Sequence, residues 1–92
     1  MSITKSSIPA GITRDHVLTA LVRIDTKGHS PHGPSVRYVV EHNGKFYPPL
    51  AVAAFAIEAC TGSDVPARSL SGGPKTPAFR MLAKHGFEPR RK

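Results

Sequence analysis

The sequence predicts an α+β fold: one small domain in which about three helices pack around a short antiparallel hairpin or small sheet. Three observations support this prediction. The chain has 92 residues, which is enough for one modest core. The pair Asn43-Gly44 between two β-prone runs is a strong hairpin signal. Three apolar or amphipathic segments begin and end at helix-capping residues. We expect a core over about residues 12–88, with flexible tails at 1–11 and 89–92.

The first predicted helix begins at Thr13, which can cap it, and ends at Lys27-Gly28. Asp15 in its first turn suits the positive end of the helix dipole. The inner face is expected to hold Val17, Leu18, Leu21, Val22 and Ile24. The next segment, up to Pro34, contains two glycines and two prolines in quick succession and is therefore predicted to be a stiff, basic loop.

Two strands and the central helix follow. Residues 36–41 and 45–47 are predicted to pair across the Asn43-Gly44 turn. Pro48 and Pro49 end the second strand and suit the first turn of a helix that runs to Cys60, with Gly62 as its stop. This helix is apolar on nearly every side, so we expect it at the centre of the core. Cys60, the only cysteine in the sequence, is expected to be a buried small hydrophobe.

A second loop leads to the last helix. Its Ser71-Gly72-Gly73-Pro74 sequence suits an anion-binding nest, although a plain surface turn explains it equally well. Thr76 is expected to cap a helix with Pro77 at its first position and Gly86 as its stop. The inward residues are predicted to be Phe79, Met81 and Leu82, and Phe87 is predicted to fold back onto the core.

The charge balance points to a polyanionic partner. Thirteen Lys and Arg face six Asp and Glu, which gives a formal charge of +7. No acid lies between Asp25 and Glu41 or between Asp64 and Glu88, so the basic residues of these windows are expected to share one face. The terminal run 90–92 is expected to be solvated charge that strengthens binding without specifying it. The alternative is a small basic protein that is merely soluble.

The catalytic inventory is poor, and we expect no enzyme. The acids are scattered, and no serine or cysteine lies in a nucleophile motif. His29, His32 and His42 could be imagined as metal ligands, but no cysteine pair matches them, so we expect no metal and no cofactor.

The longest apolar stretch, residues 50–57, is far shorter than a membrane span, and no signal peptide is evident. We therefore expect a cytoplasmic protein with no membrane partner.

The order of these features resembles a known family. Five short motifs occur in a fixed order: Gly28-His29, Ser35-Val36-Arg37-Tyr38, the run from His42 to Pro49, Leu70-Ser71-Gly72-Gly73 and His85-Gly86-Phe87. Together they resemble the sulfur-binding domain of McrA-type type IV restriction endonucleases, which recognises phosphorothioate DNA. The resemblance covers about residues 12–88. A related module, the N-terminal head domain of the same nucleases, shares much of the pattern and need not recognise sulfur.

The resemblance implies a site. The sulfur would lie in a shallow apolar cavity formed by Tyr47, Pro48 and Ala51. Contacts to the DNA backbone or bases would come from His29, His32, Ser35, Arg37, Ser71, Gly72, Gly73 and Lys75. Leu50 stands where the family often has a lysine, and Leu70 where it often has an aromatic residue. A His-Asn-His nuclease domain is missing from the sequence, so cleavage would require a separate nuclease.

The physical chemistry of sulfur is compatible with such a site. Sulfur in place of a nonbridging oxygen is larger and less strongly hydrated, so it loses less on entering an apolar cavity. Two prolines at a helix start also remove amide donors that an oxygen would prefer. The simpler interpretation is that Tyr47-Pro48-Pro49 only turns a strand into a helix. Three functions therefore stay open: a reader of double-stranded phosphorothioate DNA, a sequence-tolerant nucleic-acid binder, and a protein-interaction module.

Overall fold

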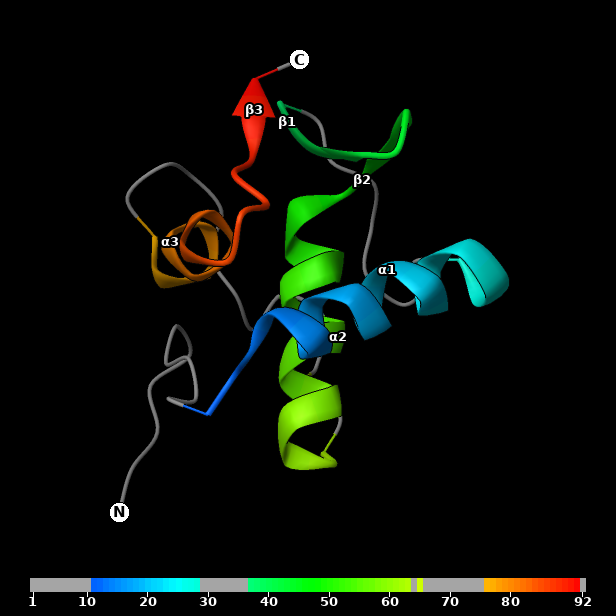
Figure 1. Ribbon diagram of the computed structural model, residues 1–92, viewed down its shortest axis with the longest axis vertical. Coiled ribbons are helices and arrows are strands. Elements are labelled where there is room, and N and C mark those ends of the chain that lie inside the picture. The colour runs from blue at the N-terminus through cyan, green and yellow to red at the C-terminus, as the bar shows by residue number, and fades with distance from the viewer. Residues whose placement is uncertain (1–10, 29–36, 64, 66–75, 92) are drawn as a thin grey trace.

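The computed structural model describes residues 11–28, 37–63, 65 and 76–91, and these form an α+β domain (Figure 1). The described part contains three helices and one antiparallel three-stranded sheet, as predicted. In chain order the elements are α1 (Arg14–Lys27), β1 (Tyr38–His42), β2 (Lys45–Tyr47), α2 (Pro49–Thr61), α3 (Pro77–Lys84) and β3 (Arg90–Arg91). None of the helices in this part is long and apolar enough to cross a membrane.

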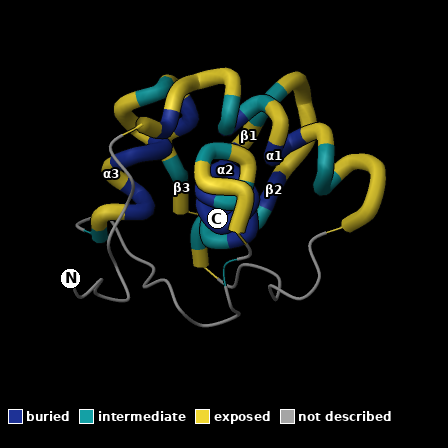
Figure 2. Tube along the Cα trace, turned by 90° about the horizontal axis from the view of Figure 1, so that it is seen from below, coloured by how far each residue is buried: buried dark blue, intermediate teal, exposed yellow. Residues whose placement is uncertain are grey.

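Helix α2 forms the centre of the domain, as its composition predicts. Seen along its axis, it lies between α1 and α3 (Figure 2). Its residues from Ala51 to Ile57 are all buried, and five of them are completely inaccessible to solvent. Four of those five are alanines, whose small side chains let neighbouring elements approach the helix closely. The helix starts with Pro49 and ends at Gly62, which has a left-handed φ of 76°.

Helix α1 crosses α2 and packs against it (Figure 1). Thr13 is the N-cap, and its backbone amide donates to Nδ1 of His16 at 2.9 Å. The buried face consists of Val17, Ala20 and Leu21. The prediction for Val22 was wrong, since its side chain is 60% exposed. Each helical residue turns by about 100°, so the position after Leu21 points away from the stripe that faces α2.

The sheet lies at the N-terminal end of α2, with the strand order β2-β1-β3 (Figure 1). Asn43 (φ 53°) and Gly44 (φ 79°) form the predicted turn between β1 and β2. Val40 lies opposite Tyr47, and both side chains are buried against the helices. The next pair along the ladder, Glu41 and Phe46, therefore points to the other face of the sheet, which is exposed.

Helix α3 has the predicted caps. The side chain of Thr76 accepts a hydrogen bond from the amide of Phe79 at 3.5 Å, and Pro77 follows at the first helical position. Phe79, Met81 and Leu82 are buried, as predicted.

After α3 the chain returns to the core at Phe87, which is 3% exposed and confirms the expected fold-back. Its amide donates to the carbonyl of Leu82 at 2.8 Å.

The C-terminal residues differ from the expected flexible tail. Arg90 and Arg91 form β3, with Arg90 opposite Val39 and Arg91 opposite Tyr38 on β1. Anchoring of Phe87 brings the following residues to the edge of β1, where unpaired backbone groups can accept another strand. Arg90 also forms an ion pair with Glu41 at 2.9 Å. A two-residue strand has no hydrophobic pattern from which it could have been predicted.

Cys60 is less buried than predicted. It is a free thiol and only partly buried, packing at the border of the core. It lies in the last turn of α2, after the run of buried residues that ends at Ile57.

Candidate nucleic-acid interface

The three residues of the expected sulfur cavity lie at the junction between β2 and α2. Tyr47 is the last residue of β2, and Pro48 is the N-cap of α2. Ala51 is completely buried and Tyr47 is 3% exposed, whereas Pro48 is half-buried. Pro48 is therefore the member of this set that an external ligand can reach without a change in core packing.

The Tyr47 hydroxyl is held by a carboxylate. It donates to Asp25 at the end of α1, with both carboxylate oxygens 3.0 Å away. Lys45 approaches the same carboxylate at 3.5 Å. These side chains line a hollow of ≈ 180 Å³ between α1 and the hairpin. The ring of Tyr47 thus connects the hairpin to α1.

This environment raises the pKa of Tyr47. Loss of hydration on burial is the largest cause, followed by the hydrogen bond to Asp25 and then by the negative charge of that carboxylate. All three causes disfavour the phenolate.

The raised pKa predicts a loss of stability in alkali. The folded state holds the Tyr47 proton more tightly than the unfolded state does, so this contribution is complete below the ordinary phenol pKa of about 10. It is lost as the pH rises from there through the folded-state pKa. We expect the unfolding free energy of the wild type to fall faster above about pH 10 than that of Tyr47→Phe. Urea titrations from pH 8 to 11 measure this, and parallel curves for the two proteins would contradict it.

Most of the expected DNA contacts cannot be placed. His29, His32, Ser35, Ser71, Gly72, Gly73 and Lys75 lie outside the described residues. Arg37 is described, and it is exposed immediately before β1. Residues 29–36, which include the first three, immediately precede Arg37 in the sequence, and Lys75 immediately precedes the cap of α3.

Three exposed arginines lie next to Tyr38 or to its ring contact Phe79 in the chain or across the ladder, and we call Arg37, Arg80 and Arg91 the basic edge. Arg37 precedes Tyr38 in the chain, and Arg91 is its partner across the β1–β3 ladder. The ring of Tyr38 contacts Phe79 edge-on at 5.3 Å between centroids, and Arg80 follows Phe79 on α3. None of the three guanidinium groups forms an ion pair with an acid in the described part of the chain.

Other cations near the core already have partners. Arg23 forms an ion pair with Glu58 at 2.7 Å, and its guanidinium lies 4.3 Å from the ring centre of Phe55. Arg14 donates to the carbonyl of His85 at 2.7 Å and stacks over Phe87 at 4.7 Å. These residues hold helices and the C-terminal segment together, which separates them from the basic edge.

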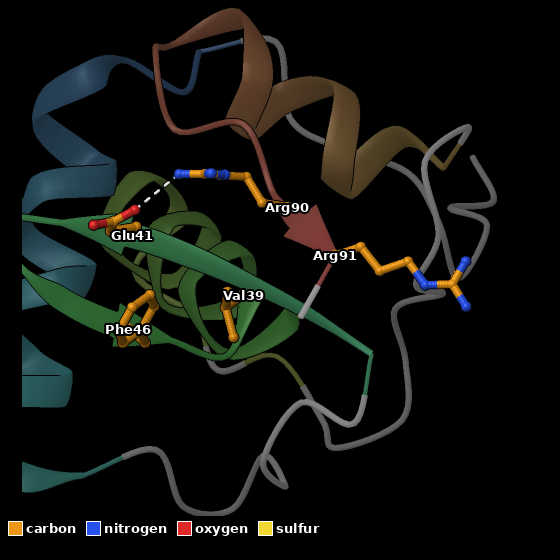
Figure 3. A pocket seen from close by; sticks show the side chains of 5 residues that line it. All are labelled: Val39, Glu41, Phe46, Arg90 and Arg91. Carbon is orange, nitrogen blue, oxygen red and sulfur yellow. Dashed lines mark hydrogen bonds and ion pairs between the residues drawn. The ribbon is translucent and has the colours of Figure 1, made fainter.

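A feature of the outer sheet face did not emerge from the sequence. Phe46 is 65% exposed, and with Val39, Glu41, Arg90 and Arg91 it lines a hollow of ≈ 470 Å³ (Figure 3). The alternation of inward and outward side chains along residues 45–47 indicates which residues share a face of the sheet. The hollow is also lined by Arg90 and Arg91, which belong to β3. Since β3 could not be predicted, neither could this site.

The described side chains contain no group of three or more metal-ligating residues. His42 instead contacts the ring of Phe87 at 5.3 Å between centroids, so it takes part in packing at the edge of the core. His29 and His32 lie outside the described residues, and their role stays a prediction.

Comparison with known proteins identifies the family. A model of ScoMcrA-like N-terminal head domains matches residues 10–91, nearly the whole chain. Comparisons with curated proteins and with solved structures gave no match. The match confirms the predicted relation to McrA-type nucleases; it is a match to the head domain, and recognition of sulfur stays a prediction. The chain belongs to the family of ScoMcrA-like N-terminal head domains.

Proposed function

We propose that this chain is a DNA-binding module and that the basic edge contacts the phosphate backbone. The observation that carries the proposal is the placement of Arg37, Arg80 and Arg91 next to Tyr38 or its ring contact Phe79, with no acidic partner among the described residues. Exposed guanidinium groups without a carboxylate partner keep their full charge and can each bind a phosphate through two hydrogen bonds. The β1–β3 pairing and the contact of Tyr38 with Phe79 bring together the segments that carry these arginines.

Family and composition support the same partner. The relation to McrA-type restriction nucleases favours DNA over other polyanions. The formal charge of +7 on 92 residues favours association with any phosphate backbone. We propose further that cleavage of bound DNA is carried out by a nuclease outside these 92 residues, as the relation to McrA-type nucleases suggests.

The finer proposal is that the bound linkage is a phosphorothioate. Pro48 and Pro49 carry no amide hydrogen, so the start of α2 offers an apolar surface with few donors. Such a surface penalises an ordinary phosphate oxygen, which would lose hydrogen bonds to water, more than it penalises sulfur. Given the burial of Tyr47 and Ala51, the sulfur would contact the half-buried Pro48 first, with the two buried side chains supporting it from beneath.

Pro48→Asp is expected to remove any preference for phosphorothioate DNA, because a carboxylate would then face the anionic linkage. Ser63→Asp, which adds the same charge at the exposed far end of α2, is the matched control. We expect the control to retain the preference. Equal preferences in Pro48→Asp and in Ser63→Asp would contradict a sulfur contact at Pro48.

Fluorescence anisotropy with two duplexes of identical sequence tests the proposal. One duplex carries a single phosphorothioate of defined stereochemistry, the other is unmodified, and several flanking sequences are used. A preference of tenfold or more, about 1.4 kcal/mol, would support sulfur recognition. Equal and salt-sensitive binding would leave DNA binding without sulfur recognition, and lack of binding to both duplexes would overturn the proposed function.

A further inference from the structure

The outer face of the sheet combines apolar and charged groups in one hollow. Val39 and Phe46 supply apolar surface, while Glu41, Arg90 and Arg91 supply charge. Register places Phe46 opposite Glu41, and Val39 opposite Arg90. Figure 3 shows Arg90 reaching toward Glu41, whereas Arg91 extends away from that pair.

Exposure of Phe46 is unexpected for an outer face. In an antiparallel sheet with one face on the core, the other face normally carries polar side chains. Here the other face carries an aromatic ring that is 65% exposed. An exposed ring beside arginines on a sheet is a suitable platform for a flat, electron-rich ligand.

We propose that this face binds an unpaired nucleobase of single-stranded DNA, with the base stacked on Phe46. The inference rests on the proposed function for the class of partner, but it uses a neighbouring surface that shares only Arg91 with the basic edge. The Glu41–Arg90 pair presents both an acceptor and donors to the edge of the base. Their ion pair is 2.9 Å long and lies at the surface, with the side chains 40% and 69% exposed, so a ligand can reach both groups.

Charge favours nucleic acid over a protein partner at this hollow. Two arginines line it against a single glutamate. Arg91 belongs both to the hollow and to the basic edge, so a backbone bound at the edge would lie next to a base on Phe46. The hollow of ≈ 470 Å³ is also within the usual size of small-ligand sites, about 300–1,000 Å³, and can hold one flat base.

The test compares a labelled oligothymidylate of about 12 nucleotides, within the usual site size of a small domain, with an abasic strand of equal length. Both strands carry the same backbone charge, so their difference in affinity reports contacts to bases. We expect the wild type to bind the oligothymidylate more tightly. Phe46→Leu keeps apolar surface but has no aromatic face, and it is expected to bind the oligothymidylate about tenfold more weakly. Its binding to the abasic strand should not change.

Phe46→Tyr is the matched variant, because it retains an aromatic face, and it is expected to bind both strands as the wild type does. Circular dichroism should show all three proteins folded, since the substituted ring is exposed. Equal binding of both strands by the wild type, or an equal loss for both in Phe46→Leu, would overturn the inference. If the duplex is still bound, the proposed function survives that result. Lack of binding to the duplex and to both single strands would overturn the two together.

Discussion

Replacing Arg37 and Arg91 together by glutamate is expected to weaken duplex binding by at least about 100-fold at low salt. Each arginine is proposed to neutralise one phosphate, and a charge-assisted hydrogen bond contributes about 1.5–3 kcal/mol. The reversed charges also repel the backbone. Both side chains are exposed and have no ion-pair partner among the described residues, so folding should not change. Anisotropy titration with a labelled duplex measures the effect.

The matched control replaces two exposed lysines by glutamate, Lys27 at the end of α1 and Lys84 in the last turn of α3. This variant has the same net charge as the first, but its changes lie at the C-terminal ends of α1 and α3, outside the basic edge. We expect it to lose much less affinity, because only long-range attraction changes. Equal losses in the two double variants would mean that overall charge, and not the basic edge, determines binding.

Tyr47→Ala is expected to lower the unfolding free energy by about 3–5 kcal/mol, the usual cost of truncating a buried aromatic residue. The side chain is 3% exposed, packs in the core and bonds to Asp25 on α1. Domains of this size are stable by about 5–15 kcal/mol, so this variant should be close to unfolding at 37 °C. Urea denaturation followed by circular dichroism measures the change.

Tyr47→Phe separates the two contributions of this side chain. It keeps the ring in the core and loses only the hydroxyl, so we expect a cost of about 1 kcal/mol. If Tyr47→Ala had nearly wild-type stability, the ring would not be a structural element. Because the large effect is on folding, loss of DNA binding in Tyr47→Ala would not by itself identify a sulfur cavity. Pro48→Asp is the more informative substitution.

Most of the secondary structure could be predicted because local rules determine it. Capping by Thr13 and Thr76, the Asn43-Gly44 turn and the stop at Gly62 each depend on a few neighbouring residues. The central position of α2 followed from its apolar composition. Val22 was misassigned because apolar character alone does not say which side of α1 faces α2.

The site was harder to predict because it depends on contacts between distant residues. The basic edge requires β3 to pair with β1 and Tyr38 to contact Phe79. No pattern in the sequence predicted either the β1–β3 pairing or the contact of Tyr38 with Phe79. The charge pattern did predict a basic face, and Arg37 and Arg80 belong both to that expectation and to the basic edge. Tyr47 and Ala51 were expected to line a cavity for sulfur, whereas the structure buries both in the core.

The most direct test of the central claim is the salt dependence of wild-type binding to an unmodified duplex. Each phosphate neutralised contributes about −0.9 to the slope of log affinity against log salt, so three contacts predict a slope of about −2.7 or steeper. The same titration with Arg37→Glu/Arg91→Glu should give a slope shallower by about 2. A slope near zero, or equal slopes for the two proteins, would contradict DNA binding through the basic edge.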